Sequence, residues 1–430
     1  MFSSARPSVA SPAAGGAVAQ LGGMITALAE LPTEAEDAER IDRIRRLTEL
    51  ESAAAAARAV ETARFATSQR AAQAAAGVPV ERVGRGVANQ VGLAMRCSPN
   101  RAQKYVGWAM TLTRELPNTF AALQAGRISE WRAVIVARET IWLSREDRAQ
   151  VDTELAPSLE SLGDRKLEAA VKRIAYRLDP QGYVARSAAA ENERRVGVRP
   201  APDCMSRLTG FGPAAQGVAM YSALNGAADA AIAAGDARGR GQIMYDTMVE
   251  RVTGQATASD VPVELNLVMT DQSVLDPHGP GGNEPAILDG YGPIPAALAR
   301  TLVLDHDAAP VWLRRMVTAP DTGELIAMES RRREFTPAQR RFLRLRDQTC
   351  RTPWCDAPIR HADHIHPAES GGPTTIDNGQ GLCQACNHAK QAIGWRSDVV
   401  SRAGPHEVDI TTPTGHRYTS NAPDPPGRVA

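Results

Sequence analysis

The sequence has no long hydrophobic run, no excess of charge of either sign, and few aromatic residues. Its 49 Lys and Arg balance 49 Asp and Glu, so no whole-chain field favours nucleic acid or a membrane surface, and any such preference must come from a local patch. No apolar run approaches the ~20 residues that a membrane span requires. Aromatic residues make up only 4% while alanine is abundant, which favours helices packed through small side chains over a β-sandwich.

Features of an exported protein are also missing. The first segment, MFSSARPSVASPAAGGAVAQ, has an early arginine but no continuous apolar core, so we expect a disordered tail over residues 1–30 and no signal peptide. A cytoplasmic location is the default expectation, and structural disulfides are not expected there. Cysteine is scarce, and Cys97 and Cys204 stand alone in apolar surroundings, which predicts buried, inert thiols.

Helical patterns dominate residues 31–330, and we expect a mainly α domain with minor β structure there. Residues 34–76 hold good helix formers with no Gly or Pro, which predicts one long helix. Residues 81–96 and 99–115 predict two helices in the order of a helix–turn–helix. Neither helix has a basic face for reading bases, so a plain pair of helices in a bundle is the favoured interpretation.

A few stretches of the same region predict strands. Residues 194–211 alternate around Pro200-Ala201-Pro202, which predicts a short β-hairpin. Residues 261–269 alternate with period two and predict a strand, and residues 311–329 predict a second hairpin. The helical domain has no chemical motif, and it is a candidate surface for homo-oligomerisation.

The charge balance changes at residue 331, where a segment extending to residue 398 begins. Seven arginines stand against a single acid, Glu334, between residues 331 and 346. Thr336-Pro337 has the form of an N-cap followed by proline at the first helical position, which predicts a basic helix. A solvated helix face and a phosphate-binding face both fit this pattern. The candidate phosphate contacts are Arg340, Arg341 and Arg344.

Two close cysteine pairs flank the most histidine-rich part of the chain. CRTPWC (350–355) and CQAC (383–386) are separated by 27 residues. This spacing is typical of a closed, structural zinc site formed by four thiolates, and a short polar module needs such a staple because its core is small. Disulfides or unconnected buried cysteines are the alternatives. The predicted zinc ligands are Cys350, Cys355, Cys383 and Cys386.

Residues between and within the pairs resemble a known motif. Asp363-His364, Gly371-Gly372, Asn378 and Leu382-Cys383-x-x-Cys386-Asn387-x-x-Lys390 occur in the order of the HNH endonuclease motif, in its zinc-knuckle form. The longer chain resembles actinobacterial repeat-family HNH proteins, in which a large helical domain of unknown function precedes the HNH module. A Pro/Gly-rich tail follows in those proteins, here expected over residues 399–430.

The resemblance implies a small α+β, zinc-stabilised ββα-metal fold and assigns roles to its residues. His364 matches the general base that takes a proton from the attacking water. Asp363 and Asn387 match ligands of a catalytic Mg²⁺ or Mn²⁺, and Asn378 matches the residue that holds the loop and orients the base. The motif here has the letters H-N-N, so adjacent His388 is an alternative ligand. Lys390 is a further candidate phosphate contact.

Elementary geometry complicates this assignment. Asp363 and His364 are neighbours, and in a regular strand their side chains point to opposite faces, so a shared site requires a bend or bulge. His361 and His366 are interpreted as ordinary exposed histidines. The sequence favours a metal-dependent DNA endonuclease. The alternative is a catalytically silent, zinc-stabilised nucleic-acid-binding protein.

Overall fold

The computed structural model describes residues 9–10, 16–254, 257, 267–268, 273, 278–279, 282–288, 291–304, 334–400 and 406–423. The chain divides into two compact units. The first unit holds residues 1–183 together with residues 316–425 and 430, and the second holds residues 184–315 with 426–429. The division therefore falls inside the region 31–330 that was expected to form one domain.

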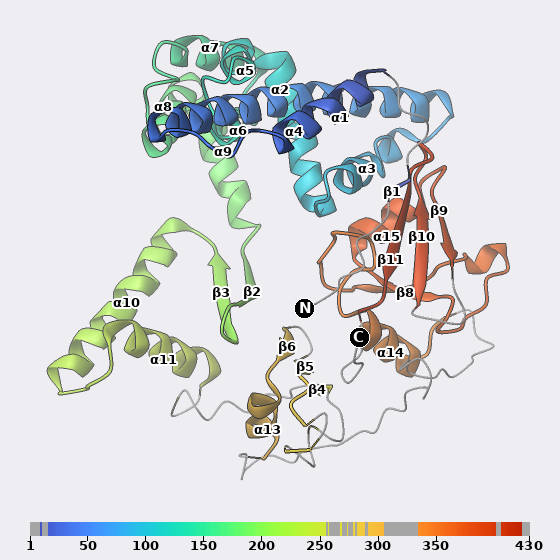
Figure 1. Ribbon diagram of the computed structural model, residues 1–430. Coiled ribbons are helices and arrows are strands. Elements are labelled where there is room, and N and C mark those ends of the chain that lie inside the picture. Colours follow the sequence, from blue (N-terminus) through green and yellow to red (C-terminus); the bar gives the residue numbers. More distant parts are fainter. Residues whose placement is uncertain are drawn as a thin grey trace. The chain divides into compact units, whose positions relative to one another are not determined.

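Helices make up the N-terminal part of the first unit, here called the helical part (residues 16–183; Figure 1). The predicted long helix over residues 34–76 is present as α2, and the predicted pair over 81–115 as α3 and α4. The helices are α1 (Gly16–Ala29), α2 (Asp37–Ala75), α3 (Val87–Ala94), α4 (Pro99–Glu115), α5 (Pro117–Gln124), α6 (Glu130–Thr140), α7 (Arg145–Leu155) and α8 (Asp164–Leu178), with a 3-10 turn at Val80–Arg82. Helix α9 (Pro180–Glu191) begins in the first unit and continues past residue 183 into the second.

Helix α2 shows how an alanine-rich sequence forms a core. Ala55, Ala56, Ala59, Ala63 and Ala66 are buried and recur at the spacing of one helix face. These small side chains let α4 and α5 pack closely against α2. Larger residues from α4 to α8 complete the main apolar cluster, among them Leu112, Leu123, Ile135, Leu155 and Leu167.

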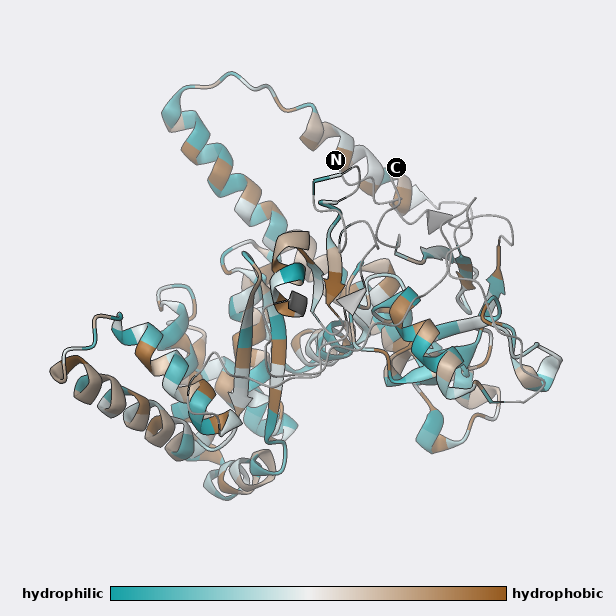
Figure 2. Cartoon of the chain, turned by 90° about the horizontal axis from the view of Figure 1, so that it is seen from below, coloured by the Kyte–Doolittle hydropathy of each residue, from teal (hydrophilic) through white to brown (hydrophobic). Residues whose placement is uncertain are grey.

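Helix α1 is a correction to the expected disordered tail. Residues 16–29 are helical, although residues 1–30 were expected to form a disordered tail because they have no continuous apolar core. In a helix, the apolar residues of GAVAQLGGMITALA recur at the spacing of one helix face, and this pattern favours a helix. None of its residues is buried, and its large apolar side chains are exposed. Figure 2 likewise shows hydrophobic residues spaced among hydrophilic ones along helices of the helical part.

The remainder of the first unit, the C-terminal module (residues 334–423), is a small α+β assembly. A two-stranded hairpin of β7 and β8 lies between α14 and α15, and a separate antiparallel sheet has the order β1-β11-β10-β9. The elements are α14 (Pro337–Asp347), β7 (His361–His364), β8 (Gly379–Leu382), α15 (Gln384–Lys390), β9 (Arg396–Val399), β10 (Glu407–Thr411), β11 (Arg417–Asn421) and, from the N-terminal end of the chain, β1 (Val9–Ala10). A 3-10 turn spans Ala368–Ser370.

The expected Pro/Gly-rich tail over residues 399–430 also requires correction. Strands β10 and β11 pair in antiparallel register, with Val408 opposite Ser420. Val408, Ile410 and Tyr418 are buried. The alternation in EVDIT and RYTSN, separated by a turn at Gly415 with φ +79°, is a hairpin pattern that the surrounding prolines and glycines obscured.

The second unit contains a predicted hairpin and a pair of helices. Strands β2 and β3 pair over residues 194–211, as predicted. Asp203 and Cys204 form the turn with positive φ, so Cys204 is exposed and not buried as expected. The elements are β2 (Arg195–Ala201), β3 (Met205–Phe211), α10 (Ala214–Ala233), α11 (Arg240–Thr253), β4 (Leu267–Val268), β5 (Ala286–Leu288), β6 (Gly292–Ile294) and α13 (Ala296–Leu304). Of the strand predicted over 261–269 only β4 is described, and the hairpin predicted over 311–329 lies outside the described residues.

Candidate metal centre and active site

The four cysteines of the C-terminal module converge on one point. Their sulfur atoms all lie within 4.8 Å of one another, and all four residues are buried and free of disulfides. Cys355 Sγ is 3.7 Å from Cys383 Sγ and 3.6 Å from Cys386 Sγ. Ligand sulfurs around one tetrahedral Zn²⁺ are about 3.8 Å apart, given Zn–S bonds of about 2.3 Å. The donor set and its spacing therefore fit zinc.

Local backbone geometry brings the two cysteine pairs together. The Cys350 amide donates to the Ala357 carbonyl at 2.9 Å, and Trp354 has φ +59°, so the first pair sits on a tight knuckle. Cys383 is the N-cap of α15, and its sulfur accepts the Cys386 amide at 3.4 Å. Hydrogen bonds from the neighbouring cysteines, first Cys350, lower the pKa of the Cys383 thiol well below its usual range. Hydrogen bonds with the same neighbours, first Cys350, raise the pKa of the Cys355 and Cys386 thiols. Thiolate is the form that binds metal.

Strands β7 and β8 place the predicted catalytic residues. Their register is regular, with Asp363 opposite Gln380 and His364 opposite Gly379. Asp363 and His364 therefore point to opposite faces of the hairpin. The bend or bulge that a shared site requires is absent between these two residues. Asp363 and His364 therefore contact different residues.

Asp363 faces helix α15. Its Oδ2 accepts hydrogen bonds from Lys390 Nζ at 2.6 Å and from Gln380 Nε2 at 3.1 Å. Lys390 also donates to the His364 carbonyl. Lys390, predicted as a phosphate contact, is thus an ion-pair partner of Asp363 in this structure.

His364 lies on the other face, against α14 and the loop before β8. Its Nε2 is 2.9 Å from the Thr374 hydroxyl oxygen. The Phe335 ring lies 4.5 Å from the imidazole, centroid to centroid. A hydroxyl partner and an aromatic wall together fix the orientation of the ring.

Asn378 holds the loop that joins the two strands. Its Oδ1 accepts from the His366 amide at 2.8 Å, and its Nδ2 donates to the carbonyls of His366 and Pro373 at 3.0 and 2.8 Å. The double glycine completes this loop. Gly371 has φ +90°, and a side chain on Gly372 would collide with the His366 carbonyl, so both positions require glycine.

Asn387 lies in the middle of α15. It precedes Lys390 by three residues, so the two share a helix face, and Lys390 contacts Asp363. Asn387 Oδ1 is buried and has no hydrogen-bond partner within the described residues. A buried carbonyl oxygen without a partner is costly, and it marks a place where a cation or a water binds. His388, the alternative ligand, is exposed at the next position.

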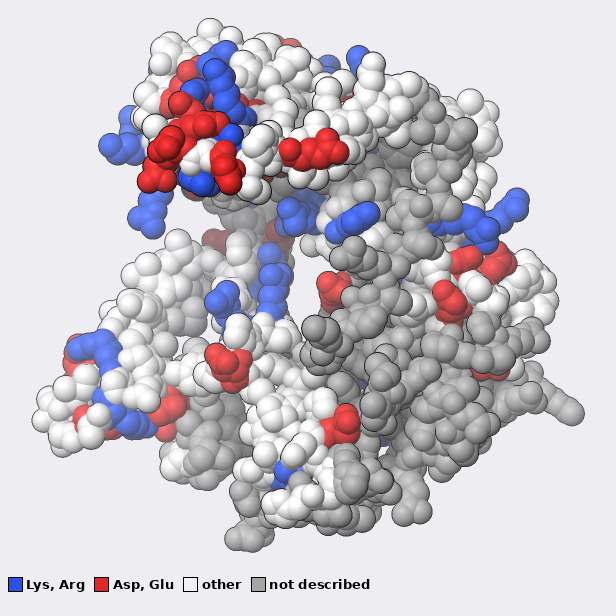
Figure 3. Space-filling view, viewed as in Figure 1, with Lys and Arg blue, Asp and Glu red and all other residues white. Residues whose placement is uncertain are grey.

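The basic helix is present as α14, with the predicted cap. The Thr336 side chain accepts the Gln339 amide, and Gln339 reciprocates in a capping box. Arg340, Arg341 and Arg344 are exposed on this helix. The arginines at 331–333 lie outside the described residues. Basic and acidic residues lie side by side among those coloured in Figure 3, in keeping with the balanced net charge.

Comparisons with known proteins agree with this organisation. Residues 44–347 match the family described as "Domain of unknown function (DUF222)". The chain belongs to the DUF222 family. Residues 348–392 match the HNH endonuclease family, so a DUF222 domain is followed by an HNH endonuclease domain. The HNH match covers the cysteine cluster, β7, β8 and α15, and it points to a nuclease.

Relatives of this DUF222 protein are themselves uncharacterised. The chain is 34% identical over 138 residues to the uncharacterized protein Rv3776 of Mycobacterium tuberculosis (strain ATCC 25618 / H37Rv), covering 32% of this chain and 24% of the relative. It is 35% identical over 150 residues to the uncharacterized protein Rv2100 of the same strain, covering 34% of this chain and 25% of the relative. The matched stretch thus spans about a quarter of each curated relative. No solved structure was found to match.

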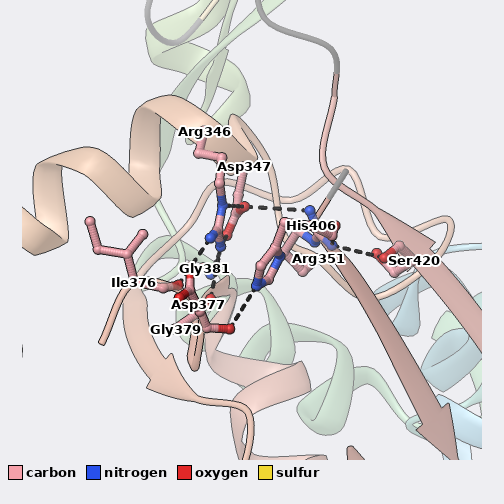
Figure 4. A network of polar contacts seen from close by, with 9 residues as sticks. All are labelled: Arg346, Asp347, Arg351, Ile376, Asp377, Gly379, Gly381, His406 and Ser420. Carbon is pink, nitrogen blue, oxygen red and sulfur yellow. Dashed lines mark hydrogen bonds and ion pairs between the residues drawn. The ribbon is translucent and has the colours of Figure 1, made fainter. Parts of the chain in front are cut away.

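The DUF222 protein also has a buried ionic network that sequence reasoning missed (Figure 4). Asp347, at the end of α14, pairs with Arg346 at 2.7 Å and accepts the Gly381 amide at 2.7 Å. Arg346 donates to the Ile376 and Gly379 carbonyls at 3.0 and 2.8 Å, so its guanidinium is held by contacts within the module. The network ties α14 to the strand that carries the motif.

The same network reaches the C-terminal sheet. Buried Arg351 lies 3.5 Å from Asp347 and donates to the carbonyls of His406 and Ser420 at 2.9 and 2.8 Å. His406 Nε2 donates to the Asp377 carbonyl at 2.9 Å. Burial, together with the nearby Arg346 charge, lowers the pKa of His406 to about 4, so this imidazole is neutral near pH 7.

Both tryptophans of the module are packing groups. Trp354 contacts Tyr418 edge-on, with ring centroids 6.1 Å apart. Trp395 packs against the cluster of Ile365, Val408 and Ile410. Among the described helices, none is long and apolar enough to cross a membrane.

Proposed function

We propose that the protein is a metal-dependent endonuclease that hydrolyses phosphodiester bonds of DNA. The observation that carries the proposal is the HNH endonuclease match over residues 348–392, on a segment folded as two strands and a helix around a four-cysteine cluster. Zinc at the cysteines is assigned a structural role, because four protein ligands leave no open position on the ion.

Asp363 and Asn387 are the residues assigned to the catalytic ion. Their carboxylate and amide oxygens suit Mg²⁺ or Mn²⁺, and the buried, unpartnered Asn387 Oδ1 supports the assignment. Two protein ligands leave positions for water and phosphate oxygens, as Mg²⁺ prefers. When bound, such an ion neutralises charge on the scissile phosphate and on the leaving oxygen.

His364 is assigned as the general base. Because it lies on the opposite face of β7 from Asp363, this assignment requires the strand to bend when metal or DNA binds. Neutral imidazole accepts a proton from water near pH 7, and proton transfer to a positioned base contributes about 10²–10⁴ to a rate. Thr374 and Phe335 are assigned to hold the ring. Lys390 now pairs with Asp363, and a cation that displaced it there would leave its ammonium group available to a phosphate. Arg340, Arg341 and Arg344 are assigned to the DNA backbone.

The test is nicking of supercoiled DNA by the purified full chain with Mg²⁺ or Mn²⁺. His364→Ala is expected to abolish nicking while leaving the zinc content unchanged. His361→Ala, on the same strand, is the matched control and is expected to retain wild-type nicking. Equal nicking by wild type and His364→Ala would remove His364 from the mechanism.

A second candidate is a catalytically silent nucleic-acid-binding protein. The opposite directions of Asp363 and His364 on a regular strand favour it, because a binder does not require the two side chains to converge. It predicts salt-dependent DNA binding with no nicking under any divalent metal. Binding and nicking measured on the same samples separate the two candidates.

A further inference from the structure

Helix α3 of the DUF222 region contacts the C-terminal module through one face. Gly86, its N-cap, and Asn89 and Gln90 are spaced i, i+3 and i+4, so they lie on the same side of the helix. Each of the three touches a different element of the C-terminal module. The contact between α3 and the module is therefore spread over three residues of the helix.

The three contacts differ in kind. A Cβ atom on Gly86 would lie 2.8 Å from Trp395 Nε1, so only glycine lets the helix approach the indole. Asn89 Nδ2 donates to Cys386 Sγ at 3.8 Å. Gln90 Oε1 accepts from the Thr414 hydroxyl at 3.2 Å. The middle contact is directed at a predicted zinc ligand.

The burial of these residues argues that the contacts are built into the fold. Asn89 and Gln90 are only 9% and 6% exposed, on a short helix whose other buried residues are mostly apolar. A buried amide without partners is unfavourable by about 1–3 kcal/mol. A buried asparagine therefore needs a hydrogen-bond partner, and the partner of the Asn89 Nδ2–H group is the Cys386 sulfur.

A small cavity lies beside this contact. It has a volume of about 20 Å³ and is lined in part by Asn89, Cys386, Lys390, Gln380 and Trp395. Gln380 Oε1 and Trp395 Nε1 are buried without partners among the described residues, and a cavity of this size holds about one water. Gln380 in turn donates to Asp363. The α3 face thus adjoins both the cysteine cluster and the residues that hold Asp363.

We propose that Asn89 is a positioning residue for the zinc centre. Its amide donates to the Cys386 thiolate and so fixes the first turn of α15, the helix from which Asn387 and Lys390 extend. An N–H donor to a ligand sulfur draws electron density from the thiolate and fixes its direction. On this account a part of DUF222 serves the nuclease centre directly. This role in holding zinc does not rest on the proposed function.

The test compares Asn89→Leu with Gln90→Leu in the full chain. Leucine has the branched outline of asparagine but is larger and has no N–H donor, and Gln90→Leu breaks the adjacent contact without touching a cysteine. Asn89→Leu is expected to weaken zinc retention against a chelator about 10- to 100-fold. It is also expected to shift the sulfur-to-metal charge-transfer band of the Co²⁺-substituted protein. Gln90→Leu is expected to leave both unchanged.

Asn89→Ala is the second variant, because alanine removes the donor without adding bulk or a negative charge beside the thiolates. It is expected to show the same loss of zinc retention and a shifted Co²⁺ spectrum, and it decides the matter if Asn89→Leu does not fold. Wild-type zinc retention and an unshifted Co²⁺ band in the folded Asn89 variants would overturn the proposal. These readouts do not need activity, so a wild-type chain that fails to nick DNA contradicts the proposed function and leaves this test intact.

Discussion

The helical part and the C-terminal module of the same unit are stabilised by different forces. The helical part has one large apolar cluster, drawn from most of its helices and filled by leucine, isoleucine, valine and alanine. The C-terminal module has small apolar clusters, four converging cysteines and a buried ionic network. The first depends on burial of many side chains, and the second on a few strong, directional contacts.

The comparison teaches where each part is vulnerable. Loss of one apolar contact removes a fraction of a large sum, whereas loss of one ligand or one network member leaves buried polar groups unsatisfied. Single changes in the C-terminal module should therefore have larger effects than single changes in the helical part, and they should be accompanied by loss of function.

Loss of a zinc ligand is expected to have the largest effect. Structural zinc contributes on the order of 10 kcal/mol to the folding of a small module, so Cys383→Ser should unfold the C-terminal module while the helical part stays folded. Two thermal transitions in the wild type and one in the variant, followed by circular dichroism, would show this. Cys97→Ser is the matched control, because that thiol lies outside the cluster; a single cooperative loss of all structure would refute the separation.

Breaking the ionic network comes next. Asp347 has a fully buried side chain and carries contacts to two arginines and one amide. Asp347→Ala leaves the arginine charges without a partner and should reduce the free energy of unfolding by about 3–5 kcal/mol. Glu334→Ala, which removes an exposed partner of Arg340, should reduce it by no more than about 1 kcal/mol in the same denaturant titration.

Truncation in the large apolar cluster should be costly but local. Leu123 is 1% exposed, and Leu123→Ala is expected to reduce the free energy of unfolding of the helical part by about 2–5 kcal/mol. Leu50 is 44% exposed, and Leu50→Ala should change that energy by less than about 0.5 kcal/mol. Zinc content should be unchanged in both, because neither residue lies on the α3 face that contacts the module. Zinc loss from Leu123→Ala would show that the large apolar cluster also supports the zinc centre.

Acid should weaken the C-terminal module through His406. Its pKa falls from 6.5 to about 4 on folding, so the unfolded state binds more protons, and stability present above pH 6.5 is lost as the pH falls towards 4. The loss should be about 2 kcal/mol near pH 5. Denaturant titrations at several pH values should show this slope in the wild type and a flatter one in His406→Gln. An unchanged slope would assign the acid sensitivity to other groups.

The sequence was sufficient for features that depend on local pattern. The long helix, the cap at Thr336 and the cysteine spacing follow from propensity, capping and ligand chemistry over short distances, and the structure has all three. The hairpin over residues 194–211 is present for the same reason. The tail over residues 399–430 was misjudged because its strands gain their stability from pairing and burial, and neither is visible in composition.

Features that depend on distant partners were not predictable. Asp347, Arg351 and His406 meet only after folding, and a charged residue at a helix end gives no sign that it will be buried. Thr374 and Gln380 carry no motif of their own, although they contact His364 and Asp363. Asn89 is 297 positions from its cysteine partner. The sequence predicted that Asp363 and His364 could share a site only if the strand bent or bulged. The regular register shows no such bend, so the two side chains point to opposite faces.

The most direct test of the account is the rate of Mg²⁺- or Mn²⁺-dependent nicking of supercoiled DNA by wild type and His364→Ala, at equal zinc content and equal DNA occupancy. The account predicts nicking by the wild type and a loss of at least about 100-fold in the variant. No nicking by either protein while both bind DNA would contradict it and identify the module as a silent nucleic-acid binder.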